Sequence, residues 1–268
     1  MMSLAVVRYP MLIRFLGCHH TETATTRMAS LLVNGTLALD AGALTSTLTS
    51  DEQSQIQGVL ITHHHYDHVR DIPTLALGGY GSKVTLPVLG TPGTLDFLKS
   101  HLLDGSLYPD FTEIPSAEEP RLRLIPLEPR EEHEMCSFKI TPTPVAHSVP
   151  AVGYMVRSSN KRSFFYTGDT NGEGLAGIWQ ALNPDLVIVE TTFSDSQESL
   201  ARLTHHMTPA LLEQEVHKLQ MNNGTVPRII VVHMHPQAEE EIVGERDHVA
   251  SRRGITITVA YEGMVIEV

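Results

Sequence analysis

The chain has 268 residues, a length that suits one large domain or two small ones. Its 31 acidic and 19 basic side chains give a formal charge of −12, with the 15 histidines counted as neutral. Because a net negative surface repels long polyanions, this balance disfavours nucleic acid as the partner. Hydrophobic residues make up 41% of the chain, enough to build a real core. We therefore predict a single domain over residues 1–268.

Short apolar runs that end at turn residues predict strands along the whole chain. These runs cover residues 11–17, 30–35, 36–41, 55–61, 84–90, 122–127, 138–141, 163–166, 185–190, 228–232 and 255–260. Between the second and third of them, Asn34 and Gly35 predict a tight hairpin turn, since both residue types accept a left-handed backbone.

Helical spacing of apolar side chains appears between several of these strands. Residues 94–103 and 209–219 predict helices, and Thr208 is expected to cap the second one. Residues 75–80 predict the end of another helix, which breaks at glycines. Residues 112–120 are acidic and contain proline, which indicates an exposed loop.

No segment resembles a targeting signal or a membrane span. Residues 1–10 are too short and too interrupted for the apolar region of a secretory signal, and no apolar run approaches the length of a membrane helix. Cys18 and Cys136 lie far apart and outside any Cys-x-x-Cys motif, which leaves one disulfide open but favours reduced thiols. We expect a cytoplasmic protein with no membrane partner.

The most informative segment follows the strand predicted over residues 55–61. It holds four potential metal ligands in a His-x-His-x-Asp-His pattern: His63, His65, Asp67 and His68. Alternate positions of an extended backbone point the same way, so the first two histidines can hold one cation while the aspartate and the last histidine turn toward a second. The interrupting residues, His64 and Tyr66, are expected to face away from the metals. The alternative is a solvated histidine-rich loop.

Three further potential ligands lie downstream, each just past a predicted strand. They are His147, Asp169 and His233. A site with two metals needs such additions: another histidine for the first ion, a carboxylate able to bridge both ions, and a final histidine for the second. Each residue alone could be a loop, turn or strand-end residue. Their combination in this order favours a hydrolase with two metal ions.

This order of ligands resembles that of the metallo-β-lactamase superfamily, and the resemblance extends from residues 12–17 and 38–42 to the last histidine. It implies an α/β (α+β) fold, a four-layer αββα sandwich of two mixed sheets packed face to face with helices outside. It also implies that three histidines bind one ion, His63, His65 and His147. The other ion would be bound by Asp67, His68 and His233. Asp169 and a water-derived hydroxide would bridge the two ions.

Two residues near the end of the chain point to the phosphodiesterase branch of this superfamily. Glu190 ends a predicted strand, and His206 precedes the predicted helix over residues 209–219. The segments 189–192 and 206–208 resemble those of tRNase Z, in which a glutamate orients a histidine. A histidine placed in this way can protonate the departing oxygen, and we expect Asp67 to accept a proton from the nucleophile. The neighbouring His205 is the rival to His206.

Residues 89–111 resemble a conserved segment of class II cyclic nucleotide phosphodiesterases, a Gly-x-x-x-Thr pattern followed by Leu, His, Asn-Gly and Ile-Trp-Pro-Asn/Asp-Phe. This chain departs from that pattern at Asp104, where the family tends to have Asn, and at Tyr108, where it tends to have Trp. The chain also lacks a segment similar to the long basic arm of tRNase Z. We therefore expect a small phosphodiester substrate such as a 3′,5′-cyclic nucleotide, cleaved by attack of a metal-bridging hydroxide.

The sequence leaves the metal and two other functions open. Histidine and aspartate suit zinc, the first choice for the two divalent ions, and also manganese or iron. Relatives with the same ligands hold two irons and bind dioxygen, so a di-iron oxygen sensor is one alternative. A thioester or lactone hydrolase is another, because this fold supports many reactions. The sequence leaves a homodimer open, and it gives His235 no role.

Overall fold

The structure is a computed structural model that describes residues 10–79, 84–222 and 224–268. Predictions for residues 1–9 and for Tyr80 lie outside this range. Two seven-stranded sheets form its centre. The first sheet has the order β14 (Val265–Glu267), β1 (Leu12–Gly17), β2 (Ser30–Val33), β3 (Leu37–Leu39), β4 (Gly58–Leu60), β5 (Leu86–Gly90) and β6 (Leu122–Pro126). The second has the order β13 (Ile257–Val259), β12 (Arg228–Val232), β11 (Leu186–Glu190), β10 (Ser163–Tyr166), β9 (Ala151–Arg157), β8 (Phe138–Val145) and β7 (His133–Met135).

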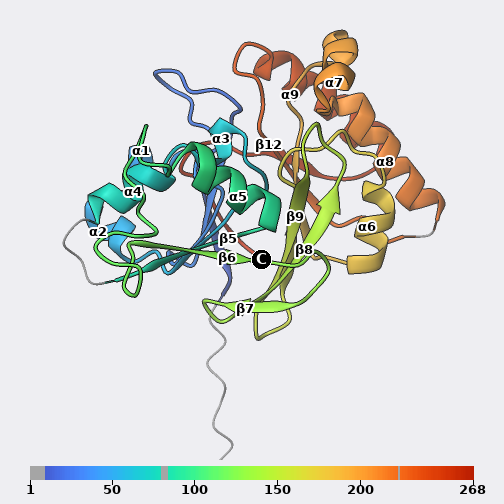
Figure 1. The fold of residues 1–268 in the computed structure, drawn as a ribbon. Helices are drawn as coiled ribbons and strands as arrows, with labels where there is room; N and C mark the ends of the chain where they lie inside the picture. Colours follow the sequence, from blue (N-terminus) through green and yellow to red (C-terminus); the bar gives the residue numbers. More distant parts are fainter. Residues whose placement is uncertain (1–9, 80–83, 223) are drawn as a thin grey trace, which may run out of the picture.

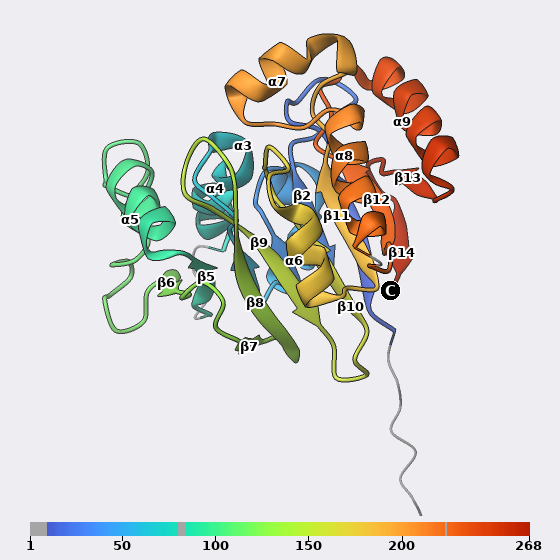
Figure 2. The ribbon, with the colours of Figure 1, turned by 90° about the vertical axis from the view of Figure 1, so that its right-hand side faces the viewer.

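Helices cover the outer face of each sheet (Figure 1). On the first sheet they are α1 (Leu44–Thr47), α2 (Ser50–Ser54), α3 (Tyr66–Val69), α4 (Ile72–Gly78) and α5 (Pro92–His101). On the second they are α6 (Leu175–Leu182), α8 (Pro209–Met221) and α9 (Glu239–Arg253). The short 3-10 helix Asp195–Gln197 leads into α7 (Glu198–Thr204), which lies past the ends of the strands, at the top of Figure 2. This arrangement confirms the predicted αββα sandwich. Within the described part of the chain, no helix has the length and apolar character needed to cross a membrane.

The alternation of side chains along each central strand explains the layers. In β10, Phe164 packs into the core between the sheets, whereas the next residue, Phe165, packs under the helices of the second sheet. β11 repeats this pattern with Ile188 and Val189. Because successive strand residues point to opposite faces and both faces are covered, these strands need the nearly continuous apolar sequences that predicted them.

The two sheets are mixed, and their parallel parts carry the predicted ligands. β3, β4, β5 and β6 run parallel in the first sheet, and β10, β11, β12 and β13 in the second. Parallel strands end at one edge of a sheet, where loops can place functional groups. The segments that follow β4, β10, β11 and β12 therefore reach a common region of the molecule.

Several element boundaries differ from the predictions. The strand predicted over residues 55–61 is shortened to Gly58–Leu60, because residues 50–54 form α2. This helix begins with a capping box, in which Thr49 accepts a hydrogen bond from the Glu52 backbone and the Glu52 side chain accepts one from the Thr49 backbone. The strand predicted over 255–260 is also shorter, Ile257–Val259.

Other expectations agree with the structure. The hairpin turn between β2 and β3 has a positive φ at both Asn34 (48°) and Gly35 (72°). Thr208 caps α8 by accepting a hydrogen bond from the backbone of Leu211, as predicted. Cys18 and Cys136 are both free cysteines.

Candidate dinuclear metal centre

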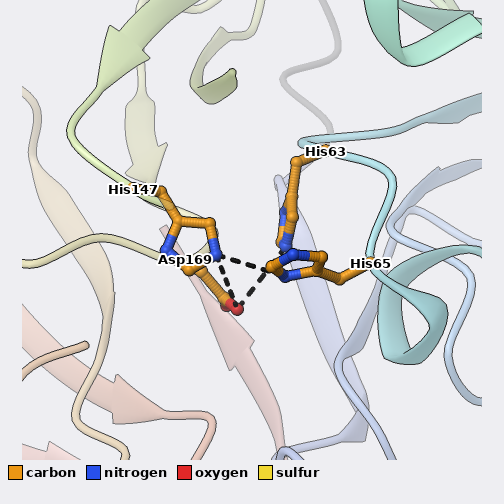
Figure 3. A group of neighbouring side chains, drawn as sticks. All are labelled: His63, His65, His147 and Asp169. Atoms are coloured by element: carbon orange, nitrogen blue, oxygen red, sulfur yellow. Dashed lines mark hydrogen bonds and ion pairs between the residues drawn. The ribbon is translucent and has the colours of Figure 1, made fainter. Parts of the chain in front are cut away.

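One group of potential ligands gathers where loops of the two sheets meet (Figure 3). Its atoms lie within 4.8 Å of one another and come from His63, His65, His147 and Asp169. The first two residues follow β4, the third follows β8 and the aspartate follows β10, so both sheets contribute. Figure 3 shows the three imidazoles and the carboxylate pointing toward a common space. We refer to these four residues as the first cluster.

A second cluster adjoins the first and shares one residue with it. Its ligand atoms also lie within 4.8 Å of one another and belong to Asp67, His68, Asp169 and His233. The first two residues lie in the short helix α3, and His233 directly follows β12 with a left-handed backbone (φ 64°). The structure thus brings together all seven residues that the sequence predicted as ligands.

Asp169 presents one carboxylate oxygen to each cluster. Its Oδ1 lies 3.2 Å from Nε2 of His68 and 3.2 Å from Nε2 of His233. Its Oδ2 lies 3.6 Å from Nε2 of His63 and 3.9 Å from Nε2 of His147. This division of the two oxygens is the geometry that a bridging carboxylate requires.

The polar atoms at the centre fit metal ions better than they fit one another. His63 Nε2 and Asp169 Oδ1 are buried and have no hydrogen-bond partner among the described residues. A buried polar atom without a partner costs free energy, which a bound cation can recover by accepting its lone pair. The donor set of imidazole nitrogens and carboxylate oxygens suits zinc, manganese or iron. The residues present therefore fit two divalent ions.

The protonation states of the first cluster support the same conclusion. Burial lowers the pKa values of the His63, His65 and His147 imidazoles, so the rings stay neutral, the form that binds metals. Burial raises the pKa of Asp169, but the adjacent histidines lower it further, so that the net pKa is well below its usual range. The carboxylate is therefore ionised and ready to bind cations.

Asp40 fixes the orientation of side chains in both clusters through hydrogen bonds. This fully buried carboxylate accepts hydrogen bonds from Nδ1 of His68 (2.8 Å), from Oγ1 of Thr62 (3.0 Å) and from the hydroxyl of Tyr166 (2.8 Å). Thr62 in turn lies 3.0 Å from Nδ1 of His63. Because the Nδ1 atoms are held in this way, the Nε2 atoms face the centre. Sequence reasoning gave Asp40 no role, although it ends an apolar run within the segment 38–42.

Replacement of Asp40 should weaken metal binding without removing a ligand. We expect Asp40→Asn to lower metal affinity by about 10- to 100-fold, the usual effect of losing a partner that orients a ligand. Titration of the metal-free protein with zinc and a competing chelator measures this change. Asp51→Asn, which alters an exposed carboxylate on α2, is the control. Unchanged affinity in Asp40→Asn would contradict the orienting role.

The two adjacent histidines at the end of α7 have different positions. His205 adopts a left-handed backbone (φ 60°), and its carbonyl oxygen accepts a hydrogen bond from Nδ1 of His147 at 3.0 Å. His206 directs its Nδ1 to Oε1 of Glu190 at 2.8 Å. The structure therefore pairs His206 with the glutamate, while His205 contacts the first cluster through its backbone.

Glu190 is fully buried and is held as a carboxylate by several donors. It accepts hydrogen bonds from the backbone of Thr170 (2.9 Å), the backbone of Met207 (3.1 Å) and the hydroxyl of Thr192 (2.7 Å). Burial lowers the pKa of His206, but the carboxylates around it, chiefly Glu190 and then Asp169 and Asp67, together raise the pKa to about 9. His206 is therefore protonated at neutral pH in this environment.

A third group of potential ligands consists of Glu190, His206 and His233. The 2.8 Å separation between His206 Nδ1 and the Glu190 carboxylate is a hydrogen-bond distance, so these two atoms satisfy each other without an ion. Neither His64 nor Tyr66 belongs to a cluster. His64 stacks on Phe97, with 4.0 Å between ring centroids, and 63% of Tyr66 is exposed.

Several aromatic and imidazole rings with no predicted role lie beside His233 of the second cluster. His20 has its ring centroid 5.7 Å from that of His233 and 4.9 Å from that of His235. Phe193 stacks beside His235 at 6.2 Å and lies 5.9 Å from His206. The loop that carries His20 follows β1, and no sequence signal placed it near the ligands.

The two-sheet fold and these His/Asp clusters are typical of the metallo-β-lactamase class of proteins. Residues 31–234, more than half of the chain, match the family described as Beta-lactamase superfamily domain, and the chain belongs to this family.

Curated relatives are similar over part of the chain. Ribonuclease Z from Pyrococcus abyssi is 29% identical over 132 residues, which are 47% of this chain and 39% of that protein. The match therefore spans about two fifths of the length of the relative.

Solved structures share the fold over nearly the whole chain. The crystal structure of unliganded yeast PDE1 superposes with a TM-score of 0.79 at 18% identity, covering 97% of this chain and 99% of that one. The metallo-β-lactamase fold protein YhfI from Bacillus subtilis gives a TM-score of 0.76 at 19% identity, covering 97% of this chain and 100% of the other. At these identities the likeness concerns the fold alone.

Proposed function

We propose that the protein is a dinuclear metal-dependent phosphodiesterase that hydrolyses 3′,5′-cyclic nucleotides. The observation that carries this proposal is the position of Asp169, with one oxygen in each cluster, next to His206 and its buried partner Glu190. Two cations, one in each cluster, would suit the in-line displacement at a phosphodiester. A histidine beside them can supply a proton to the departing oxygen.

In this proposal His63, His65 and His147 would hold the first ion, and Asp67, His68 and His233 would hold the second. Asp169 would contribute one carboxylate oxygen to each site. When bound, the two ions would activate a water molecule and neutralise the charge that develops on the phosphoryl oxygens.

Three side chains of the protein handle protons in the proposed reaction. Asp67, whose side chain is 20% exposed, accepts a proton from the attacking water at the edge of the second cluster. His206 gives its proton to the departing oxygen. Glu190 acts through His206, because its carboxylate fixes the imidazole and raises its pKa.

The cyclic nucleotide as substrate rests on the segment 89–111, which resembles class II cyclic nucleotide phosphodiesterases. This segment contains α5 and ends with Phe111, which is buried against the first sheet. Phe97 on α5 stacks on His64, the neighbour of His65, so the segment reaches the edge of the first cluster. The fold shared with yeast PDE1 is compatible with this substrate.

RNA is a second candidate substrate, favoured by the partial similarity to ribonuclease Z. An RNA strand offers the same phosphodiester group to the metals. The formal charge of −12 weighs against it, because a long polyanion gains affinity mainly from basic side chains.

Metal analysis and assays on purified protein test the proposal. We expect two zinc or manganese ions per chain, hydrolysis of cyclic AMP or cyclic GMP, and hydrolysis of a bis-aryl phosphodiester. Cleavage of a precursor tRNA with inert cyclic nucleotides would favour the RNA substrate. Iron with an oxygen-dependent absorption band and no turnover would favour the di-iron sensor, whereas turnover confined to thioesters or lactones would favour that hydrolase.

A further inference from the structure

A polar cavity of about 300 Å³ lies beside His206, on the side of the second sheet. Its walls come from the loop that follows Asp169, from α7 and from α8. Figure 2 shows α8 beside α6, with α7 above them, and the loop after β10 leads into α6. The imidazole of His206 thus lines this cavity and also lies beside Asp169, which belongs to both clusters. This connects the cavity to the site of the proposed reaction.

The charges around the cavity are largely balanced within the protein. Lys218 pairs with Glu215 at 2.5 Å, and Arg202 pairs with Glu198 at 2.7 Å. Because each cation already has a carboxylate partner, the cavity offers little to a second phosphate group. A neutral group that forms several hydrogen bonds suits it better.

Two of the polar side chains that line the cavity remain available to such a group. Among the described residues, the carboxylate of Glu173 and the amide of Gln214 have no hydrogen-bond partner. Both residues are exposed, one on the loop after β10 and the other on α8. Together they provide carboxylate acceptors, an amide acceptor and an amide donor, a set that matches a sugar hydroxyl, which donates and accepts.

We propose that this cavity binds the ribose of the substrate and that Glu173 and Gln214 hydrogen-bond its 2′-hydroxyl. The inference rests on the proposed function, in which His206 protonates the departing O3′. The 2′-hydroxyl is on the neighbouring carbon of the ring, so an O3′ at His206 brings the 2′-hydroxyl to the cavity. Carboxylates recognise ribose hydroxyls in this way in nucleotide-binding proteins. The site therefore selects ribonucleotides over 2′-deoxyribonucleotides.

Kinetics with matched sugars test the inference. On the metal-loaded protein, kcat/KM for cyclic AMP should exceed that for its 2′-deoxy analogue by about tenfold, the effect of one hydrogen bond to a charged group. The double variant Glu173→Ala/Gln214→Ala should reduce this ratio to about one. Glu134→Ala, which removes an exposed carboxylate from β7, should retain the ratio. Equal efficiency with both sugars in the wild type, or a full preference in the double variant, would overturn the inference.

Calorimetry separates a failure of this inference from a failure of the proposed function. AMP should bind the metal-loaded wild type about tenfold more tightly than 2′-deoxy-AMP, and the double variant should bind both equally. If the protein cleaves a bis-aryl phosphodiester but no cyclic nucleotide, the proposed substrate is wrong and the binding data still decide the role of the cavity. Equal affinities of the wild type for AMP and 2′-deoxy-AMP would reject the ribose site.

Discussion

Asp169→Ala is expected to abolish the pair of metal ions and lower turnover by more than about 100-fold, which is the upper end for residues that only orient a ligand. The reason is that Asp169 alone belongs to both clusters, with one carboxylate oxygen in each. Without it, each cluster keeps only three potential ligands, and no carboxylate joins the two ion sites. Metal content per chain after gel filtration, measured by mass spectrometry, gives the result.

Asp247→Ala is the matched control, because it removes an exposed carboxylate on α9 that belongs to neither cluster. It should keep both ions and full activity. A fully loaded and active Asp169→Ala protein would show that the carboxylate does not bridge. Circular dichroism should confirm that the variant is folded, since Asp169 is buried.

His206→Ala should lower turnover of a cyclic nucleotide by about 10²- to 10⁴-fold while both metal ions remain. The imidazole is paired with Glu190, so its loss removes a proton donor and no ligand of either cluster. A substrate with a good aryl leaving group should suffer less, because its departing oxygen needs less help from an acid. Loss of both ions in this variant would make His206 a ligand instead.

The pH dependence of the same step tests the partner of His206. As an acid, His206 must be protonated, so activity should fall as pH rises through the pKa of this residue. Glu190 raises that pKa, and Glu190→Gln should therefore move the alkaline fall in turnover to lower pH. An alkaline limb at the same pH in wild type and variant would contradict the positioning role of Glu190.

The residues of the two clusters could be predicted from the sequence because they lie just past predicted strands. Asp169 and His233 both follow a buried apolar strand, and the strand order brings the ends of such strands together. The network beneath them was not predictable in this way. Asp40 meets His68 and Tyr166, which lie 28 and 126 residues away in sequence, and no local pattern encodes such contacts.

Local signals also explain which elements sequence reasoning missed. The residues of α2 have no buried side chain, so no apolar period marks this helix, and its capping box stabilises its start. β9 contains Gly153, a residue that weakens a strand pattern. The structure requires this glycine, since a Cβ atom there would lie 2.6 Å from the ring of Phe165. The cavity beside His206 depends on how α7 and α8 pack beside the loop after β10, which the sequence does not reveal.

The hydrogen bond from His147 to the carbonyl of His205 connects the first cluster with the segment that carries His206. A single peptide unit joins His205 to His206, so this hydrogen bond ties the segment that carries the proposed proton donor to the His147 ring. Metal uptake at the first cluster would hold that ring in place. Occupancy of the first ion site would therefore favour the alignment of the proposed acid.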